Sequence, residues 1–565
     1  MEKRWVIKSA EEEKISALQK ELRIHPVLCK LLVQRGITDF NSAKVFFRPK
    51  LSDLHDPFLM KTMSIAIERI EKAIASNEKI LIYGDYDVDG TTSVALVYSF
   101  FKNIYNNLDF YIPNRYTEGY GISLKGIDYA KENNCALVIA LDCGIKANDK
   151  MEYANKLGID FIICDHHIPG EEIPKANAVL DPHQADCSYP YKELSGCGIG
   201  FKLIQAFAQK NNFPFETITQ YLDLVVISIA SDIVPITGEN RVLAYYGLQI
   251  LNNNPRKGIK ALIEVSALQP PLNITNIVFG LGPRINAAGR LDDAKNAVLM
   301  LLSDTHAIAK DNADILQDKN NDRREIDKKI TGEALQILQN DPDEKNKVTN
   351  VLFNENWHKG VVGIVASRVI DQYYKPTILL TLSNGMIVGS ARSVKNFDIY
   401  EAIKECSDLL DQFGGHMYAA GLSLIPENLE AFKQKFDAVV RKRILPEQRI
   451  PEVEIDAEIK LGDIRIEFFN ILKQFAPFGP QNMSPVFLSK NIISNGKTKI
   501  VGDGHLKLGM KDENLFHADG IAFQKGAYYE DLLAGKKFDV CYAIEENYFN
   551  GMEKLQLNVK EIKMS

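Results

Sequence analysis

Several features that define other classes of protein are absent from this 565-residue sequence. It contains no run of roughly eighteen or more apolar residues, so we expect no transmembrane helix. The first residues, MEKRWVIKSAEEEK, become polar at once and lack the apolar core of a signal peptide. No internal repeat or low-complexity segment is visible. These absences predict a protein without a membrane anchor, located in the cytoplasm.

Cysteine pairs are also missing, because the 8 cysteines are scattered and form no C-x-x-C motif. Several stand in apolar runs, which indicates buried thiols in a reducing compartment rather than a disulfide framework or a zinc site. Apolar residues make up 45% and charged residues 25%, which excludes a mostly disordered chain. The formal net charge of -7 neither indicates nor excludes nucleic acid, but a polyanionic substrate would need a local basic surface.

The length predicts three to five domains at roughly 100–200 residues each. Short apolar runs alternate with helix-like stretches in the second part of the chain and again in the fourth, which predicts α/β structure with a parallel sheet. The last part is rich in strand-like pieces separated by turn residues, which fits a small closed barrel of the oligonucleotide-binding type. The expected parts are a helical region 1–75, an α/β domain 76–250, a helical connector 251–345, a second α/β domain 346–445 and a barrel 450–565.

The first α/β domain carries strand-like runs that each end in polar residues. In parallel sheets, ligands bind beyond the carboxyl ends of the strands, where this sequence places its acids and histidines. A charged stretch without proline, from Asp304 to Gln339, predicts a long exposed helix that bridges two lobes. The expected strands of the first domain lie within 79–87, 107–115, 135–144 and 160–167.

The motif GDYDVDG places Asp85, Asp87 and Asp89 at every second residue. At the end of a strand this spacing puts alternate side chains on one side, where the carboxylates would repel. Two unit charges about 4 Å apart interact by about 4 kcal/mol at an effective dielectric near 20, so a cation is expected among them. Oxygen ligands suit a hard ion such as Mg²⁺ or Mn²⁺. An acidic loop in water is the alternative; an EF-hand does not fit, since the twelfth residue from Asp85 is Leu96.

Three further elements carry possible ligands at the ends of apolar runs. Asp142 follows one run, the triplet Asp165-His166-His167 follows another, and Asp232 ends an apolar helix. A lone histidine is more often structural, but two adjacent histidines beside an aspartate at a strand end favour a ligand role. Four such elements at one sheet edge favour a site for two metal ions. Mixed carboxylate and imidazole ligands favour Mn²⁺ somewhat over Mg²⁺.

The motifs DYDVDG, DCG, DHH and SD, in this order and spacing, resemble the DHH phosphoesterase superfamily. GLGPRINAAGR, NENWHKGVVGIVASR, GSARS, FGGHMYAAGL and FAPFGPQN further resemble the RecJ family of exonucleases specific for single-stranded DNA. The resemblance covers nearly the whole chain. It implies two α/β lobes, a parallel-sheet DHH domain and a smaller DHHA1 domain, joined by a long helix around a central groove, with a C-terminal OB-like barrel.

The resemblance also implies roles for individual residues. Two divalent cations, Mn²⁺ or Mg²⁺, would be held by Asp85, Asp87, Asp89, Asp142, His166 and Asp232. Catalysis would involve Asp142, as the bridge between the ions, with His166, His167 and His416, the last two on the substrate phosphate. The substrate would be bound by Arg115, Ser390 and Arg392 at its 5′-phosphate, and by His358, Arg284 and Asn286 elsewhere. Arg115 in a surface ion pair, Ser390 as a turn residue, and Arg284 and Asn286 as braces between lobes are the alternatives.

The function implied is a 5′-to-3′ exonuclease that releases 5′-mononucleotides in DNA repair and recombination. Its partners would be single-stranded DNA with a 5′ end, a single-strand-binding protein and a helicase, and the protein would be a monomer that binds no membrane. Base-stacking candidates are Tyr116, Tyr120, Tyr373, Tyr374, Phe475, Phe478 and Phe487. Two alternatives are a DHH phosphodiesterase for short oligonucleotides or cyclic dinucleotides, and a RecJ-like scaffold without activity. The second would have lost metal ligands, and here all six are present.

Overall fold

The computed structural model describes residues 3–291, 293–549 and 552–564, which divide into two compact units. The larger unit comprises residues 6–286, 294–314 and 454–565, and the smaller unit comprises 1–5, 287–293 and 315–453. None of the helices in these residues is long and apolar enough to cross a membrane. The cysteines are free and buried, as their apolar surroundings predicted.

The larger unit contains a five-stranded sheet in which every neighbouring pair is parallel. Strand β3 lies on one side of β2, and the later strands β4, β5 and β6 follow one another on its other side. The strand order therefore reverses between β2 and β4. Ligands of open parallel sheets bind at such a reversal. The strands in order are β3 (Leu108–Tyr111), β2 (Lys79–Gly84), β4 (Cys135–Leu141), β5 (Asp160–Cys164) and β6 (Ala178–Leu180).

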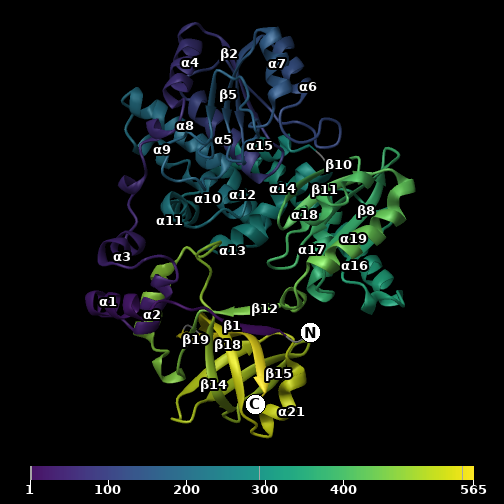
Figure 1. The fold of residues 1–565 in the computed structure, drawn as a ribbon. Helices are drawn as coiled ribbons and strands as arrows, with labels where there is room; N and C mark the ends of the chain where they lie inside the picture. The colour runs from purple at the N-terminus through teal and green to yellow at the C-terminus, as the bar shows by residue number, and fades with distance from the viewer. Residues whose placement is uncertain (1–2, 292, 550–551, 565) are drawn as a thin grey trace. The chain divides into compact units, whose positions relative to one another are not determined.

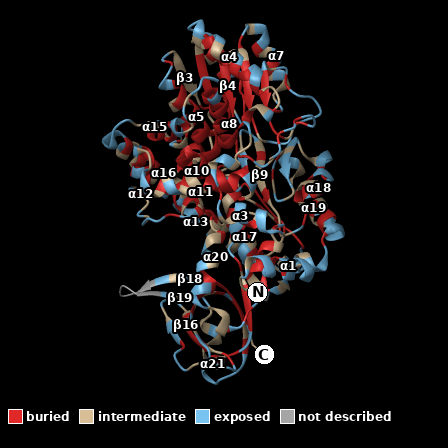
Figure 2. Cartoon of the chain, turned by 90° about the vertical axis from the view of Figure 1, so that its left-hand side faces the viewer, coloured by how far each residue is buried: buried red, intermediate tan, exposed pale blue. Residues whose placement is uncertain are grey.

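Helices cover both faces of this sheet (Figure 1). Side chains alternate between the faces, so Leu81 and Tyr83 of β2 share a core with α6 and α7, while α4, α5 and α8 pack on the opposite face. The strands are therefore buried on both sides, which explains their continuous apolar runs (Figure 2). The helices are α4 (Met63–Ala75), α5 (Val88–Lys102), α6 (Leu124–Glu132), α7 (Asn148–Leu157) and α8 (Gly196–Lys210).

A second layer of helices surrounds α10, whose residues from Leu222 to Ala230 are all buried. This helix packs against α5, α8 and α11, so its carboxyl end is fixed relative to the sheet. The segment after it is helical, as expected, and includes a π-helix, η3 (Ile277–Leu281). The helices of this layer are α9 (Glu216–Thr219), α10 (Leu222–Ser231), α11 (Gly238–Asn253), α12 (Lys257–Val265), α13 (Ile274–Asn276), α14 (Gly282–Leu291) and α15 (Lys295–Leu301).

The C-terminal part of the larger unit is a closed barrel, because β14 pairs with β18 on one side and with β16 on the other. The helices α1 to α3 share its hydrophobic core. Its strands are β13 (Ala457–Glu458), β14 (Phe487–Ser494), β15 (Lys499–Val501), β16 (His505–Lys511), β17 (His517–Ala522), β18 (Phe538–Phe549) and β19 (Met552–Met564). Its helices are α1 (Glu12–Leu22), α2 (Pro26–Val33), α3 (Phe40–Phe47), α20 (Ile466–Leu472) and α21 (Tyr529–Leu533).

The smaller unit contains a mixed sheet in which only β7 and β8 are parallel. One face packs on α17 and the second half of α16, and the other packs on α18 and α19. The strands in order are β10 (Gln412–His416), β11 (Ala419–Leu424), β9 (Met386–Arg392), β8 (Thr377–Ser383) and β7 (Asn350–Phe353). The helices are α16 (His306–Asn340), α17 (Val362–Gln372), α18 (Ile399–Lys404) and α19 (Leu429–Arg443); β1 (Arg4–Ile7) and β12 (Glu452–Ile455) form a separate pair.

The predicted fold class is confirmed: a parallel α/β sheet, a second α/β sheet and a strand-rich C-terminal barrel are all present, with a helix of 35 residues where a long one was predicted. The prediction of a base-stacking role is wrong for two residues. Phe475 and Phe487 are fully buried in the core that the barrel shares with the N-terminal helices, because their rings fill it.

Candidate metal centre

Three strands of the parallel sheet end in the same row. Gly84, Leu141 and Cys164 are register partners at the ends of β2, β4 and β5. The next residue of each strand is an aspartate, and neighbouring strands lie about 4.8 Å apart. Asp85, Asp142 and Asp165 therefore emerge side by side at the carboxyl edge, as the sequence predicted.

The GDYDVDG motif has a different local structure from the predicted one. Strand β2 ends one residue before Asp85, and α5 begins one residue after Asp87. Asp87 caps this helix by accepting a hydrogen bond from the N–H of Gly90 at 3.0 Å, and Asp89 lies in the first turn. The three aspartates thus occupy a strand-turn-helix junction and do not alternate along a strand. A Cβ on Gly90 would lie 2.3 Å from the carbonyl oxygen of Asp85, so the tight junction requires glycine there.

Asp142 has a left-handed backbone, with φ of 58°. This region is sparsely populated for residues other than glycine, although aspartate tolerates it. The conformation is held by a hydrogen bond of 2.8 Å from the Asp142 N–H to the carbonyl of Cys164. The start of α8 lies against the side chain, since a Cβ on Gly196 would be 2.6 Å from the Asp142 Cβ. Gly196 therefore allows the helix to approach the site.

The Asp89 carboxylate is fixed at the N-terminus of α8. It accepts hydrogen bonds of 2.7 Å from the N–H groups of Gly196 and Cys197 and from the hydroxyl of Ser228. A helix N-terminus favours a negative charge because its first N–H groups are free to donate. Sequence reasoning missed Ser228. The only signal was its position four residues before Asp232, which places both on one face of α10.

The His166 imidazole lies at the centre of the cluster. Its Nε2 atom is 3.2 Å from Asp142 Oδ1, 3.6 Å from Asp232 Oδ2 and 3.7 Å from Asp89 Oδ2. Two overlapping sets, Asp142–His166–His167 and Asp89–His166–Asp232, have ligand atoms within 4.8 Å of one another. The structure thus brings together side chains that stand far apart in the chain.

The first residue of the DHH triplet orients the third. Asp165 is buried and accepts hydrogen bonds from His167 Nδ1 at 2.7 Å and from the N–H of Ile145 at 2.9 Å. Burial alone would raise the pKa of Asp165, but the hydrogen bond and charge of His167 lower it to about 2. Burial opposes a charge on His167 as well, yet Asp165 raises its pKa to about 9. The opposite nitrogen, Nε2, lies 3.1 Å from the Tyr120 hydroxyl.

The remaining carboxylates repel one another. Burial, and then the neighbouring carboxylates, raises the pKa of Asp85, Asp87, Asp142 and Asp232. Asp85 Oδ2 is buried without a hydrogen-bond partner. The charges of Arg115 and His167 oppose these rises only in part. Four acidic side chains around the imidazole of His166 therefore fit a pair of hard divalent ions, whose charge would offset the repulsion. We call these residues, with Asp89, the metal cluster.

The metal cluster opens to solvent on one side. Asp85, Asp89 and Asp142 are buried, whereas Asp87 and Asp232 are partly exposed. A hollow of about 290 Å³ beside it is lined by Tyr120, Asp165, His167, Lys146 and Lys150, among others. An anion can therefore approach from the side of His167.

Two predicted substrate-binding regions lie near the metal cluster in the same unit. The guanidinium of Arg115 lies 5.1 Å from the ring centroid of Tyr86, and its charge opposes the rise in the pKa of Asp85. Helix α14 carries Arg284 and Asn286 and begins beside the end of α10, where a Cβ on Gly282 would be 2.7 Å from the hydroxyl oxygen of Ser231. Ser231 directly precedes Asp232. The structure thus places both regions at the metal cluster's edge.

The other predicted residues belong to the smaller unit. Arg392 Nη1 donates to the Ser390 hydroxyl at 2.8 Å, and both residues lie on β9. The second residue of α17, Gly363, packs against them, because a Cβ there would be 2.9 Å from Arg392 Nη2 and from Ser390 Oγ. An arginine fork, a hydroxyl and a helix N-terminus together form a suitable site for a phosphate.

The two predicted histidines of this unit are close to that site in the topology. His416, at the end of β10, pairs with Ala419, which in turn pairs with Arg392. His416 is exposed rather than part of the core. His358 lies in the loop before α17, and its Nδ1 accepts a hydrogen bond from the N–H of Gly360 at 3.2 Å.

Comparison with known proteins gives one consistent result. Family models match residues 79–229 (DHH family, N-terminal domain), 344–442 (DHHA1 domain) and 455–561 (RecJ OB domain). The single-stranded-DNA-specific exonuclease RecJ of Bacillus subtilis is 36% identical over all of this chain and 71% of its own length. Crystal structures of Thermus thermophilus RecJ with Mn²⁺ and with Mg²⁺ are each 25% identical to the present chain and have TM-scores of 0.84 and 0.79. Both alignments cover 99% of this chain, and 79% and 78% of those chains.

The substitution Asp142→Asn tests the repulsion within the metal cluster. Because it removes one buried charge without changing the size of the side chain, we expect the chelated variant to melt at the same or a higher temperature than the unchanged protein. Mn²⁺ at 100 times its Kd should stabilise the unchanged protein by about 2.7 kcal/mol and the variant much less, as measured by calorimetry. Asp186→Asn, an exposed carboxylate paired with Lys61, is the control. Full stabilisation of Asp142→Asn by Mn²⁺ would contradict this assignment.

The pH dependence of the chelated protein gives an independent test. Carboxylates with a raised pKa keep protons that the unfolded chain has already lost, so stability falls as the pH rises above about 4. His167 acts in the same direction. Its contribution to the stability of the folded protein is complete below about pH 6.5 and is lost as the pH passes about 9. We therefore expect a higher melting temperature at pH 6 than at pH 8 in chelator, and a smaller or reversed difference in Mn²⁺. Equal melting temperatures in chelator would count against the raised pKa values.

Proposed function

The chain belongs to the RecJ family of single-stranded-DNA-specific exonucleases, and from this premise we propose that it releases 5′-mononucleotides from the 5′ end of single-stranded DNA by metal-dependent hydrolysis. The observation that carries the proposal is the buried metal cluster around His166, placed where the strand order of the parallel sheet reverses. A metal-dependent enzyme that acts on phosphodiesters uses such a cluster of oxygen and imidazole ligands to hold divalent ions.

The ion-binding residues in this proposal are Asp85, Asp87, Asp89, Asp142, His166 and Asp232. Bound Mn²⁺ or Mg²⁺ would supply an activated water and stabilise the departing 3′ oxygen. The protein residues keep these ligands in place: the α8 N-terminus fixes Asp89, and the left-handed backbone directs Asp142 into the cluster. His167, held by Asp165 through Nδ1 and close to the Tyr120 hydroxyl through Nε2, lines the hollow beside the cluster, where it can contact the scissile phosphate.

The smaller unit would bind the 5′-terminal phosphate through Arg392, Ser390 and the N-terminus of α17. Arginine offers a planar fork that matches a phosphate, and burial lowers the pKa of Arg392 without removing its charge at neutral pH. His416 and His358 are further contacts in this proposal, as are Arg115, Arg284 and Asn286 from the larger unit. Recognition of a terminal phosphate would set the 5′-to-3′ direction.

The barrel has one face suited to a nucleic acid strand. Phe523 is 55% exposed and makes an edge contact with His505 at 5.2 Å. Lys499 and Lys507 are direct partners on β15 and β16, an arrangement that is unfavourable unless a polyanion lies between them. We infer that this face binds the strand by stacking and charge, as oligonucleotide-binding barrels do.

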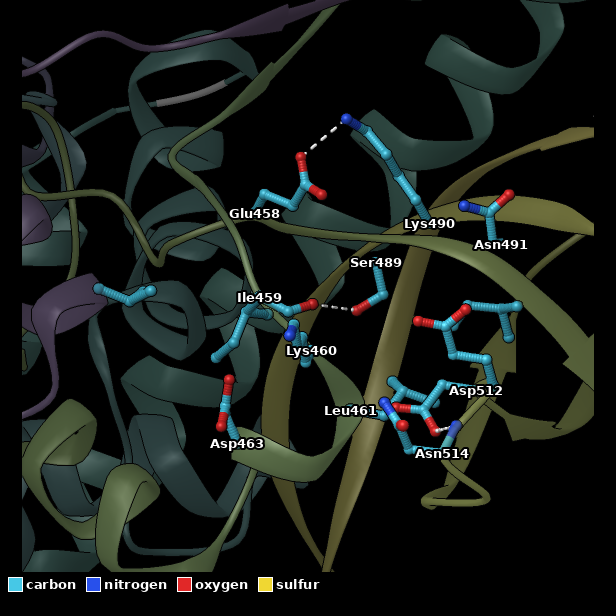
Figure 3. A pocket seen from close by; sticks show the side chains of 13 residues that line it. Glu458, Ile459, Lys460, Leu461, Asp463, Ser489, Lys490, Asn491, Asp512 and Asn514 are labelled. Carbon is cyan, nitrogen blue, oxygen red and sulfur yellow. Dashed lines mark hydrogen bonds and ion pairs between the residues drawn. The ribbon is translucent and has the colours of Figure 1, made fainter.

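A separate pocket of about 480 Å³ on the barrel is less suitable for DNA (Figure 3). Four carboxylates and two lysines line it, and one of the lysines, Lys490, is paired with Glu458 at 2.7 Å. The excess of negative charge would repel phosphates. The charged lining residues are Glu458, Lys460, Asp463, Lys490, Asp512 and Glu513.

The five predicted domains, at 1–75, 76–250, 251–345, 346–445 and 450–565, remain part of this proposal. So do the role in repair and recombination, the single-strand-binding protein and helicase as partners, and the monomeric state. A scaffold without activity is disfavoured by the complete ligand set, and a phosphodiesterase for short oligonucleotides is disfavoured by the additional barrel.

Digestion of an end-labelled strand tests the activity, its direction and its strand preference together. With Mn²⁺ or Mg²⁺ we expect a 5′ label to be released at once as a mononucleotide, and a 3′-labelled strand to shorten gradually. The matching blunt duplex and a chelated sample should stay intact. Asp142→Asn should lower kcat at least about 100-fold, the upper range for loss of a group that supports a metal site. Shortening from the 3′ end, or equal digestion of the duplex, would refute the proposal.

The substitution Arg392→Lys tests the terminal phosphate site. Lysine keeps the charge but loses the fork, so we expect the preference in kcat/KM for 5′-phosphorylated over 5′-hydroxyl strands to fall by roughly ten-fold or more. Arg368→Lys, in the same unit and paired with Asp327, is the matched control. An unchanged preference in Arg392→Lys would place the phosphate contact elsewhere.

A further inference from the structure

Some strongly exposed apolar side chains belong to segments that carry metal-cluster residues or pack on such a segment. Among the described residues, five large apolar side chains are more than 60% exposed, and three of them, Ile168, Ile233 and Phe279, belong to segments of the metal cluster or to its direct neighbours. We call these three residues the apolar collar. Single exposed apolar residues are ordinary on a protein surface, but several on segments that adjoin one polar site favour a binding role.

The local structure connects each collar residue to the metal cluster. Ile168 directly follows His167, and Ile233 directly follows Asp232. Phe279 lies on the π-helix η3, which packs against α10, the helix that ends at Ser231. Single π-turns occur frequently at functional sites. The apolar collar is thus fixed by the same elements that position the ligands.

The backbone of Ile233 is strained, with φ of 62°. A β-branched residue rarely adopts this left-handed region, whereas glycine or asparagine does so easily. The side chain is 64% exposed, so burial does not explain why isoleucine stands there. Residues with a strained backbone cluster at functional sites.

The collar cannot be explained by the phosphates of the substrate. Phosphates are attracted by divalent ions, Arg115 and His167, whereas Ile168, Ile233 and Phe279 have only apolar surface to offer. The apolar part of a DNA strand is the face of each base. In a duplex these faces are covered by neighbouring base pairs, whereas in a single strand they are available for contact.

We propose that Ile168, Ile233 and Phe279 contact the faces of unpaired bases next to the scissile phosphate. The enzyme then selects single strands by the apolar surface that they expose, in addition to any selection by size. This inference rests on the proposed exonuclease function, of which it names a specificity determinant.

The test compares two strands of equal length and equal phosphate content, one carrying bases and one abasic throughout. Each collar side chain is exposed, so the double variant Ile233→Ser/Phe279→Ser should fold. We expect it to lose roughly ten-fold or more in kcat/KM on the base-bearing strand, by analogy with the loss of a stacked aromatic, and less than about two-fold on the abasic strand. The unchanged protein should prefer the base-bearing strand, and the variant should lose this preference.

Two controls separate the collar from general effects. Ile104→Ser changes an exposed isoleucine beyond the C-terminal end of α5, the opposite end of the helix whose N-terminus carries Asp87, and should change neither rate. Ile233→Gly should relieve the strained backbone, so we expect an equal or higher melting temperature together with a lower preference for bases. Phe279→Trp should retain the preference, and its fluorescence should be quenched by the base-bearing strand in chelator.

Two outcomes would overturn the inference: equal losses of the double variant on both strands, or no loss on either. If the unchanged protein cleaves neither strand with Mn²⁺, the proposed exonuclease function fails. The collar is then still tested by binding, because the affinities of the unchanged protein and the double variant for the two strands can be measured in chelator. Equal affinities of both proteins for the base-bearing strand would end the proposal.

Discussion

The mutual repulsion of clustered carboxylates is the constraint on which the site depends. Asp85, Asp87, Asp142 and Asp232 share a small volume in which burial and neighbouring charges raise the pKa of each. Such a cluster is stable only because rigid elements hold it: the aligned strand ends, the packed α10 and the N-terminus of α8. The energetic cost in the metal-free protein is the source of its affinity for divalent ions, and thus of its chemistry.

Much of the fold could be predicted because its signals are local. Continuous apolar runs predicted four of the five strands of the parallel sheet, and turn residues between short strands predicted the barrel. Strand β6 was not predicted, because a strand of three residues is too short to show an apolar pattern. The aspartates of GDYDVDG were expected on an extended strand, but the chain turns after Asp85 and Asp87 caps a helix. Sequence spacing of two does not distinguish these cases.

The sequence predicted which acids and histidines lie together, but not the geometry in which they do so. The acids and histidines follow apolar runs, which was enough to gather them at one edge. The contacts that fix them come from distant residues: Ser228 and the α8 N-terminus hold Asp89, and no local pattern marks such partners. The exposure of individual side chains could not be predicted from the sequence either. Phe475 and Phe487 were expected to stack on bases and are buried, whereas Ile233 and Phe279, which received no role, are among the most exposed of the large apolar side chains in the described residues.

The residues of the metal cluster span positions 85 to 232 of the chain and follow three strands that are neighbours in the sheet, β2, β4 and β5, and a helix beyond it, α10. A ribosome that has released only the first two strands has made acids that have no imidazole or closing carboxylate beside them. The cluster is therefore complete only when the chain extends through α10 to Asp232. A copy that ends before this helix lacks one of the carboxylates around His166.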